Sequence, residues 1–136
     1  MEISINYWAV LAAAVANMLV GSLWYGPLFG KQWKKLMGFS AEDPKSMKMK
    51  ASTAMVGGLV TALVTAYVLA HFADVWGALD TAGAFALAFW IWLGFVATTQ
   101  LAGVLWEGRP GKLFFLYTLQ SLVSLVVIAW ILVAWL

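Results

Sequence analysis

Four long apolar segments constrain this chain more than any other feature of its sequence. They cover approximately residues 6–25, 51–72, 82–106 and 113–135. An apolar helix of about 20 residues crosses a hydrocarbon layer of about 30 Å, and lipid-exposed backbone must satisfy its own hydrogen bonds. Runs such as residues 122–133 do not alternate between apolar and polar positions, as barrel strands would. The sequence therefore predicts an all-α membrane protein, with four transmembrane helices in an antiparallel bundle and a single domain over residues 1–136.

Composition excludes several other classes of protein. The chain is 64% hydrophobic and 10% charged, whereas soluble domains are about half apolar and about a quarter charged. The net charge is only +2 and the basic residues are clustered, which argues against a nucleic-acid partner. Because the chain has no Cys and one His, we expect no disulfide framework, no metal site and no cofactor.

The basic residues predict how the chain is oriented. Every Lys and Arg lies in one of two predicted loops, the first containing Lys31, Lys34, Lys35, Lys45, Lys48 and Lys50, and the second Arg109 and Lys112. The opposite side carries Glu2, Asp74 and Asp80 and no base. By the positive-inside rule both basic loops are cytoplasmic, and both termini face outward.

The stretch from Asn17 to Trp33 leads out of the first helix into the basic loop. Proline lacks a backbone donor and disfavours helix at the residue before it, so Pro27 is predicted to end the first helix. In residues 30–37 apolar and lysine positions fall on opposite sides, which predicts a short interfacial amphipathic helix on anionic lipid. The predicted anchors of this segment are Trp24, Pro27, Phe29, Lys31, Trp33, Lys34 and Lys35.

Local signals predict where other helices begin and end. Gly38 is predicted to end the amphipathic helix, and Asp43-Pro44 reads as a cap that starts the second helix before the membrane. Either Asp80 or Thr81 is predicted to cap the third helix.

The stretch from Asn17 to Trp33 carries the pattern Asn17-x3-Gly21-x2-Trp24-Tyr25-Gly26-Pro27-x-Phe29-Gly30-x2-Trp33. In this pattern the chain resembles a bacterial family of small membrane proteins, catalogued as domain of unknown function 1761. The resemblance covers essentially the whole chain, including the turn at residues 107–110. It implies a four-helix, multi-pass protein of the bacterial cytoplasmic (inner) membrane. It implies no established activity and therefore assigns no functional residues.

Polar side chains recur within the predicted spans, mostly in the halves nearest the basic loops. The candidates for a polar cluster are Asn17, Ser22, Tyr25, Thr98, Gln100, Tyr117, Gln120 and Ser121. They predict either an interhelical hydrogen-bond network or a polar cavity open to the cytoplasm that holds a small solute. We favour the network, because buried amides and hydroxyls commonly link helices in this way.

Small residues recur at four-residue spacing on the first two helices. They are Ala9, Ala13 and Gly21, with Asn17 between them, and Ala54, Gly58, Ala62 and Ala66. Such faces let helix backbones approach closely. Because four helices do not need all of this surface, the sequence predicts a homo-oligomer formed through the faces left over.

Two functions remain open at this point. No span carries a charged residue deep inside, as ion-coupled pumps usually do. No nucleophile–base pair is evident, since His71 lies far in depth from the serines, so we expect no enzyme. The favoured function is a structural or accessory membrane protein that binds lipid or a partner. The alternative is a homo-oligomeric channel or carrier for a small uncharged solute.

Overall fold

The structure of the chain is a computed structural model that describes residues 5–37 and 51–135. Its elements in chain order, with η marking a π-helical segment, are α1 (Tyr7–Leu23), η1 (Trp24–Leu28), α2 (Gly30–Met37), α3 (Ala51–Trp76), α4 (Thr81–Ile91), η3 (Trp92–Ala97), α5 (Thr98–Glu107) and α6 (Gly111–Ala134). The predicted helix end at Gly38, the cap at Asp43-Pro44 and the lysines Lys45, Lys48 and Lys50 lie outside the described residues.

Several of these elements join into longer helices. α1 and η1 form one apolar helix over Tyr7–Leu28, and α4, η3 and α5 form another over Thr81–Glu107. Together with Ser52–Trp76 and Gly111–Ala134, they make four helices that are long and apolar enough to cross a membrane. The predicted all-α fold with four spans is therefore confirmed, and the span boundaries agree with the prediction to within a few residues.

Side-chain caps fix two of the helix starts. The Asn6 side-chain oxygen accepts from the N–H groups of Trp8 and Ala9, at 3.1 and 3.3 Å. The Asp80 carboxylate accepts from the N–H of Gly83 at 2.7 Å. These three bonds satisfy backbone donors that the first turn of a helix leaves without a partner. The bond from Gly83 confirms the predicted cap at Asp80.

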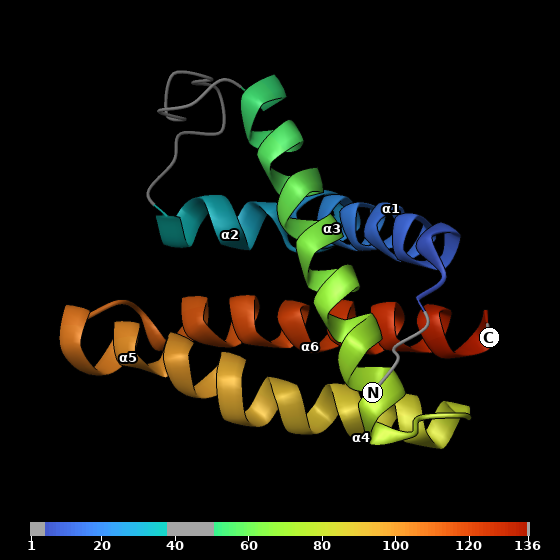
Figure 1. Cartoon of the computed structure of the whole chain (residues 1–136). Coiled ribbons are helices and arrows are strands. Elements are labelled where there is room, and N and C mark those ends of the chain that lie inside the picture. Colours follow the sequence, from blue (N-terminus) through green and yellow to red (C-terminus); the bar gives the residue numbers. More distant parts are fainter. Residues whose placement is uncertain (1–4, 38–50, 136) are drawn as a thin grey trace.

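The helix α6 is the centre of the arrangement. In its most apolar stretch 44% of the residues are buried, compared with 17–22% in the other three spans. In Figure 1, α1, α6 and the α4–α5 helix run side by side, while α3 crosses them obliquely and contacts α1 most extensively. α1 runs antiparallel to α6, because Asn6 reaches the Trp135 carbonyl oxygen at 3.5 Å and Tyr25 contacts Tyr117 at the other end.

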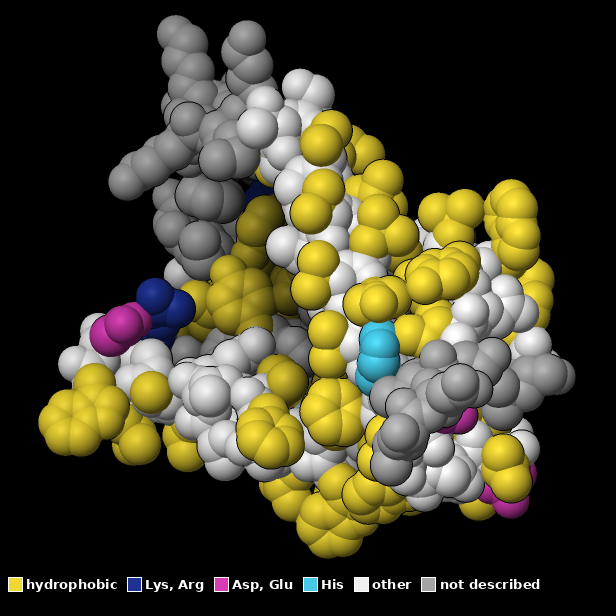
Figure 2. Space-filling model, viewed as in Figure 1, with side chains coloured by type: hydrophobic (Ala, Val, Ile, Leu, Met, Phe, Trp, Pro, Cys, Tyr) yellow, Lys and Arg dark blue, Asp and Glu magenta, His cyan; other side chains and the backbone are white. Residues whose placement is uncertain are grey.

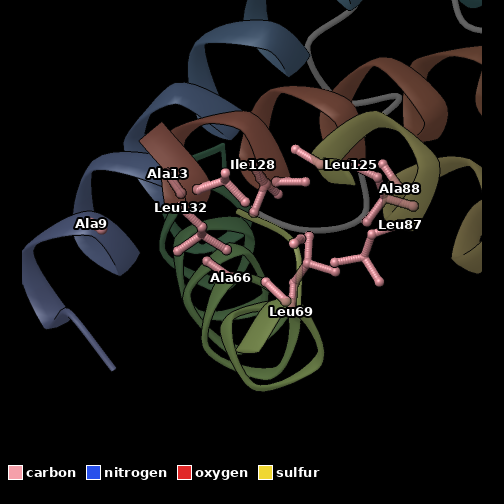
Figure 3. Close-up of a cluster of buried hydrophobic side chains, with 14 of the residues drawn as sticks. Ala9, Ala13, Ala66, Leu69, Leu87, Ala88, Leu125, Ile128 and Leu132 are labelled. Atoms are coloured by element: carbon pink, nitrogen blue, oxygen red, sulfur yellow. The ribbon is translucent and has the colours of Figure 1, made fainter. Parts of the chain in front are cut away.

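The core depends on small residues. Side chains that are 0% exposed come from four helices, namely Ala13, Ala14, Ala66, Ala84, Ala88, Ile128 and Ala129. Figure 3 shows leucines from α3, α4 and α6 converging with Ile128 on these alanines. Because alanine occupies little volume, the helix backbones approach one another closely, which is the main source of attraction between helices in lipid. Part of the predicted small-residue face of the first helix is thus used within the chain.

Pro27 lies inside the first helix, which ends one residue later at Leu28, so the prediction that Pro27 itself ends the helix is wrong by one residue. The helix continues in π-helical form with Pro27 inside it, and the N–H of Phe29 donates to the carbonyl of Trp24 at 2.8 Å. The widened turn accommodates a residue that has no N–H to donate, so the helix is not broken. The predicted amphipathic helix follows as α2, and in Figure 1 it extends roughly along the line of α1. Its position at the membrane interface stays a prediction.

The outer surface of the helices is apolar. Large exposed hydrophobic side chains occur on every span, including Trp8, Val64, Phe95 and Trp130. On the face shown in Figure 2, hydrophobic side chains cover the helices, and acidic side chains appear at its two opposite ends. Such a surface would be a large liability in water but matches the hydrocarbon of a bilayer. The chain is therefore built as a multi-pass membrane protein.

Candidate functional site

The candidate site is organised around one polar stretch of the central helix, residues 117–124 of α6. Most of its hydroxyl groups form hydrogen bonds within α6 itself. Thr118 donates to the carbonyl of Phe114, and Ser121 donates to the carbonyl of Tyr117 at 2.9 Å. Gln120 donates through its side-chain nitrogen to Ser124 Oγ at 2.7 Å. These local bonds let an apolar helix carry polar side chains without a bound ligand.

Both π-helical segments contact this polar stretch. From η3, the indole Nε1 of Trp92 donates to the carbonyl of Thr118 at 2.7 Å, which uses the second lone pair of that oxygen. From η1, the ring of Tyr25 lies 6.0 Å from the ring of Tyr117. Single-turn π segments inside α-helices occur frequently at functional sites. Two of them meeting the same turns of α6 single out this region of the bundle.

Three aromatic residues, Tyr25, Trp33 and Tyr117, form what we call the aromatic clasp. The indole Nε1 of Trp33 donates to the hydroxyl of Tyr117 at 3.1 Å, and its ring centroid lies 5.3 Å from that of Tyr25. The clasp fastens α2 to α6. Trp33 is half-buried against the bundle, and its location at the lipid interface stays a prediction. Nothing in the sequence indicated this contact, because Trp33 and Tyr117 are 84 residues apart.

The lysine face of α2 points away from the clasp. Lys31, Lys34 and Lys35 are all exposed, whereas Phe29 and Trp33 are half-buried. This division confirms the amphipathic character predicted for the segment. Of the other predicted anchors, Trp24 packs its ring 4.6 Å from that of Phe29, and Pro27 is exposed.

Gln100 of α5 joins the polar stretch from the other side. Its side-chain nitrogen lies 3.4 Å from Ser121 Oγ, a long hydrogen bond. Its carbonyl oxygen is buried and has no partner in the described part of the chain, and neither has the buried indole nitrogen of Trp24. A buried polar atom without a partner costs about 1–3 kcal/mol. A further polar group would be stabilising beside either of these two atoms.

The structure brings together only part of the predicted polar cluster. Tyr25, Gln100, Tyr117 and Ser121 meet through the contacts above, and Gln120 lies on the same stretch of α6. Two members lie apart from it. Ser22 is exposed, and Thr98 is exposed and donates to the carbonyl of Gly94 on its own helix at 2.7 Å.

Asn17 lies further from the basic end of the bundle than Tyr25 does. It is half-buried on α1. Tyr25 is level with Tyr117, and Asn6 is level with Trp135. Since α1 and α6 are antiparallel between these two pairs, Asn17 is level with the turn of α6 that contains Ser124.

The structure explains why the Asn17–Trp33 pattern has a glycine at position 30. Gly30 is buried at the start of α2, and a Cβ added there would lie 2.8 Å from the carbonyl oxygen of Tyr25. We expect Gly30→Ala to destabilise the protein by about 1–3 kcal/mol, because backbone must shift to admit the methyl group. Gly26→Ala is the matched control, since nothing lies within 4 Å of its added Cβ, and should change stability by less than about 0.5 kcal/mol. Thermal unfolding in detergent micelles measures both, and equal effects would contradict this account of Gly30.

Two cavities lie at opposite ends of the bundle. The basic-end cavity, about 340 Å³, is lined by Thr99, Gln100, Ala102, Gly103, Val104, Glu107, Arg109, Leu113, Phe114 and Tyr117. The acidic-end cavity, about 100 Å³, is lined by Ile5, Asn6, Ala9, Ala70, Ala73, Asp74, Ala78, Leu79, Leu132 and Val133. Along α6 the two are separated by residues 118–131, which include the fully buried Ile128 and Ala129.

A metal-binding arrangement is not found among the residues that the structure describes, where no three His, Cys, Asp or Glu side chains gather. His71, the chain's one histidine, uses Nδ1 in a hydrogen bond with the carbonyl oxygen of Tyr67 at 2.9 Å.

Comparison with known proteins gives one match. The family described as "Protein of unknown function (DUF1761)" matches residues 8–133, which is nearly the whole chain. No curated protein and no solved structure matches.

Proposed function

This chain belongs to the family of proteins of unknown function DUF1761, and we propose that it is a structural or accessory membrane protein that binds membrane lipid. On this proposal it catalyses no reaction and conducts no solute. Its place is the bacterial cytoplasmic membrane, with the basic end of the bundle toward the cytoplasm and both termini outside, as the distribution of lysine and arginine favours.

The observation that carries the proposal is the packed core between the two end cavities. Ala13 of α1, Ala88 of α4 and Ile128 of α6 are 0% exposed. A carrier or channel needs polar groups or a water-filled path along its axis. In the described part of one chain, the polar stretch of α6 and its partner Gln100 lie toward the basic end, and this apolar core separates them from the acidic end. A blind polar cavity suits binding better than permeation.

Lipid is the favoured ligand because of the position of the charges. Lys31, Lys34 and Lys35 are exposed on α2, and Arg109 and Lys112 are exposed beside the turn between α5 and α6. Each base near a membrane surface attracts anionic lipid by about 1 kcal/mol. The exposed Trp106, next to the same turn, is the kind of residue that lies at headgroup level. All these residues belong to the basic end of the bundle.

A swelling assay tests the proposal. Purified protein is reconstituted into liposomes, which are then mixed with an excess of glycerol, urea or a small sugar, and light scattering follows solute entry. At every protein-to-lipid ratio we expect solute to enter at the same rate as in protein-free liposomes. Solute entry that rises in proportion to the amount of protein would overturn the proposal and favour the channel or carrier. Liposomes containing a known glycerol channel serve as the positive control.

We also propose a homo-oligomer, formed through the exposed small face of α3. Gly57 and Thr61 on this face are exposed, and nothing lies within 4 Å of a Cβ added at Gly57. Gly58, by contrast, faces Met18 of the same chain, with atoms 3.5 Å from its added Cβ. Gly57→Leu should weaken association about tenfold, whereas Gly58→Ala should leave it unchanged. Mass spectrometry from mild detergent measures the assembly, and finding only monomers of the unmodified chain would refute the proposal.

A further inference from the structure

We propose that the basic-end cavity binds a zwitterionic phosphoethanolamine group, with its phosphate on Arg109 and its ammonium on Glu107. This inference rests on the proposed lipid-binding function and names the headgroup that the site would select. The cavity has about 340 Å³ of space and lies between α5 and α6. That volume falls within the range of small-ligand sites in proteins.

The charges at the mouth of the cavity are complementary to such a headgroup. Arg109 Nε lies 2.8 Å from Glu107 Oε2, and about 60% of each side chain's surface is exposed. An exposed pair of this kind contributes little to stability, so each partner can exchange the other for a ligand group at small cost. The guanidinium offers a fork of donors that matches two phosphate oxygens, and the carboxylate accepts from an ammonium.

The turn between α5 and α6 is shaped to hold Arg109 over the cavity. Gly108 has a left-handed φ of 68°, which reverses the chain after α5. The N–H of Arg109 then donates to the carbonyl of Gly103 at 3.1 Å. A Cβ on Gly103 would lie 3.1 Å from Cδ of Arg109, so the absence of a side chain there makes room for the arginine stem.

The walls supply the remaining interactions that a headgroup needs. Gln100 lines the cavity, and its carbonyl oxygen lacks a partner in the described residues. A rotation of its terminal amide would offer this acceptor to an ammonium N–H, in exchange for the long hydrogen bond from its side-chain nitrogen to Ser121 Oγ. Leu113 and Phe114 give the cavity an apolar wall, against which the glycerol and upper acyl carbons of a lipid would lie.

This site differs from the lysine face of α2 in what it can distinguish. Lys31, Lys34 and Lys35 carry only positive charge, so they attract any anionic headgroup. The cavity carries one charge of each sign, and a purely anionic headgroup would leave Glu107 without a partner. Selection of the zwitterion therefore requires both Arg109 and Glu107.

The test measures which lipid stays bound. The full chain is placed in nanodiscs with equal amounts of phosphatidylethanolamine and phosphatidylglycerol, and mass spectrometry records the lipids retained on its release. We expect preferential retention of phosphatidylethanolamine. Arg109→Gln should lower this retention about tenfold, as expected for loss of a charged hydrogen-bond partner. Glu107→Gln should remove the preference between the two lipids.

Two further variants keep the result interpretable. Lys112→Gln removes a charge that attracts net anionic lipid from the same turn but lies outside the cavity lining. It should therefore lower the retention of phosphatidylglycerol, while the retention of phosphatidylethanolamine changes less than about twofold. Gly103→Ala keeps every charge and crowds Arg109, so it should lower retention. The phosphoethanolamine group could come from a lipid or from a soluble molecule, and soluble glycerophosphoethanolamine, added as competitor, distinguishes the two. Displacement of the lipid at micromolar concentration would assign the site to the soluble molecule and overturn the lipid assignment.

Equal retention of the two lipids by the unmodified chain, or equal losses in Arg109→Gln and Lys112→Gln, would overturn the inference. Neither outcome depends on solute entry. A failure of the headgroup site with no solute entry leaves the accessory function standing, whereas solute entry alone overturns that function and leaves the headgroup result to be judged separately.

Discussion

Ala88→Leu is expected to destabilise the folded bundle by about 1–3 kcal/mol, because it inserts three carbons into a core that has no room for them. Ala88 lies on α4 and is 0% exposed where that helix packs on α6. In lipid, helices gain little from hiding apolar surface, so close packing supplies most of their attraction. A residue that separates two backbones therefore removes a main source of stability. Thermal unfolding in micelles, followed by circular dichroism, measures the change.

Ala82→Leu provides the matched control for this prediction. It makes the same substitution on the same helix, but Ala82 is exposed. Its effect should stay within about 0.5 kcal/mol. If Ala88→Leu were as stable as the unmodified chain, the close contact between α4 and α6 would not exist in the folded protein.

Trp33→Ala is expected to release α2 from the bundle. The isolated helix would have only eight residues, too few to be stable without tertiary contacts. Loss of a half-buried tryptophan should cost about 2–3 kcal/mol locally, which is less than the roughly 3–5 kcal/mol for fully buried aromatic residues. Hydrogen–deuterium exchange of the amides in residues 31–36 should accelerate by at least about tenfold, while exchange in α6 stays slow.

Two other variants separate the contributions of Trp33. Trp33→Phe keeps an aromatic ring and removes the hydrogen bond to Tyr117, so it should cost only about 1 kcal/mol. Trp106→Ala removes an indole that is 86% exposed and should leave α2 unchanged. Exchange in α2 that is already fast in the unmodified protein would contradict the clasp and favour an α2 that lies free on the membrane.

The long apolar segments predicted the helices well, because each helix forms from interactions within its own segment. A segment such as residues 113–135 has one stable form in lipid, since only a helix satisfies its backbone internally. The Asp80 cap was predictable for the same reason, because its partner Gly83 is three residues away.

The π segments and the oblique course of α3 were not predictable, because they depend on tertiary contacts. Pro27 at the end of an apolar run usually stops a helix, but here the N–H of Phe29 reaches back to the Trp24 carbonyl and carries the helix past it. The small residues of α3 suit close packing with several partners. The sequence does not choose between them.

For the candidate site, the sequence predicted how deep each polar residue lies along its helix, but not which residues it contacts. Gln100 and Ser121 do meet, as their depths suggested. Ser22 and Thr98 lie at similar depths but on exposed faces, and Thr98 satisfies its hydroxyl on its own helix. The clasp was missed because tryptophan beside lysines is also the pattern of a membrane anchor.

The central claim is that the basic-end cavity is closed by a packed core, and cysteine labelling tests it most directly. The chain has no native Cys, so each single-cysteine variant reports one position. In proteoliposomes, Ala102→Cys lines the basic-end cavity and should react with a membrane-impermeant maleimide from that side alone. Ser124→Cys and Ala129→Cys, in the buried core, should not react from either side. Reaction of both core positions in the folded protein would reveal a water-filled path and contradict the account.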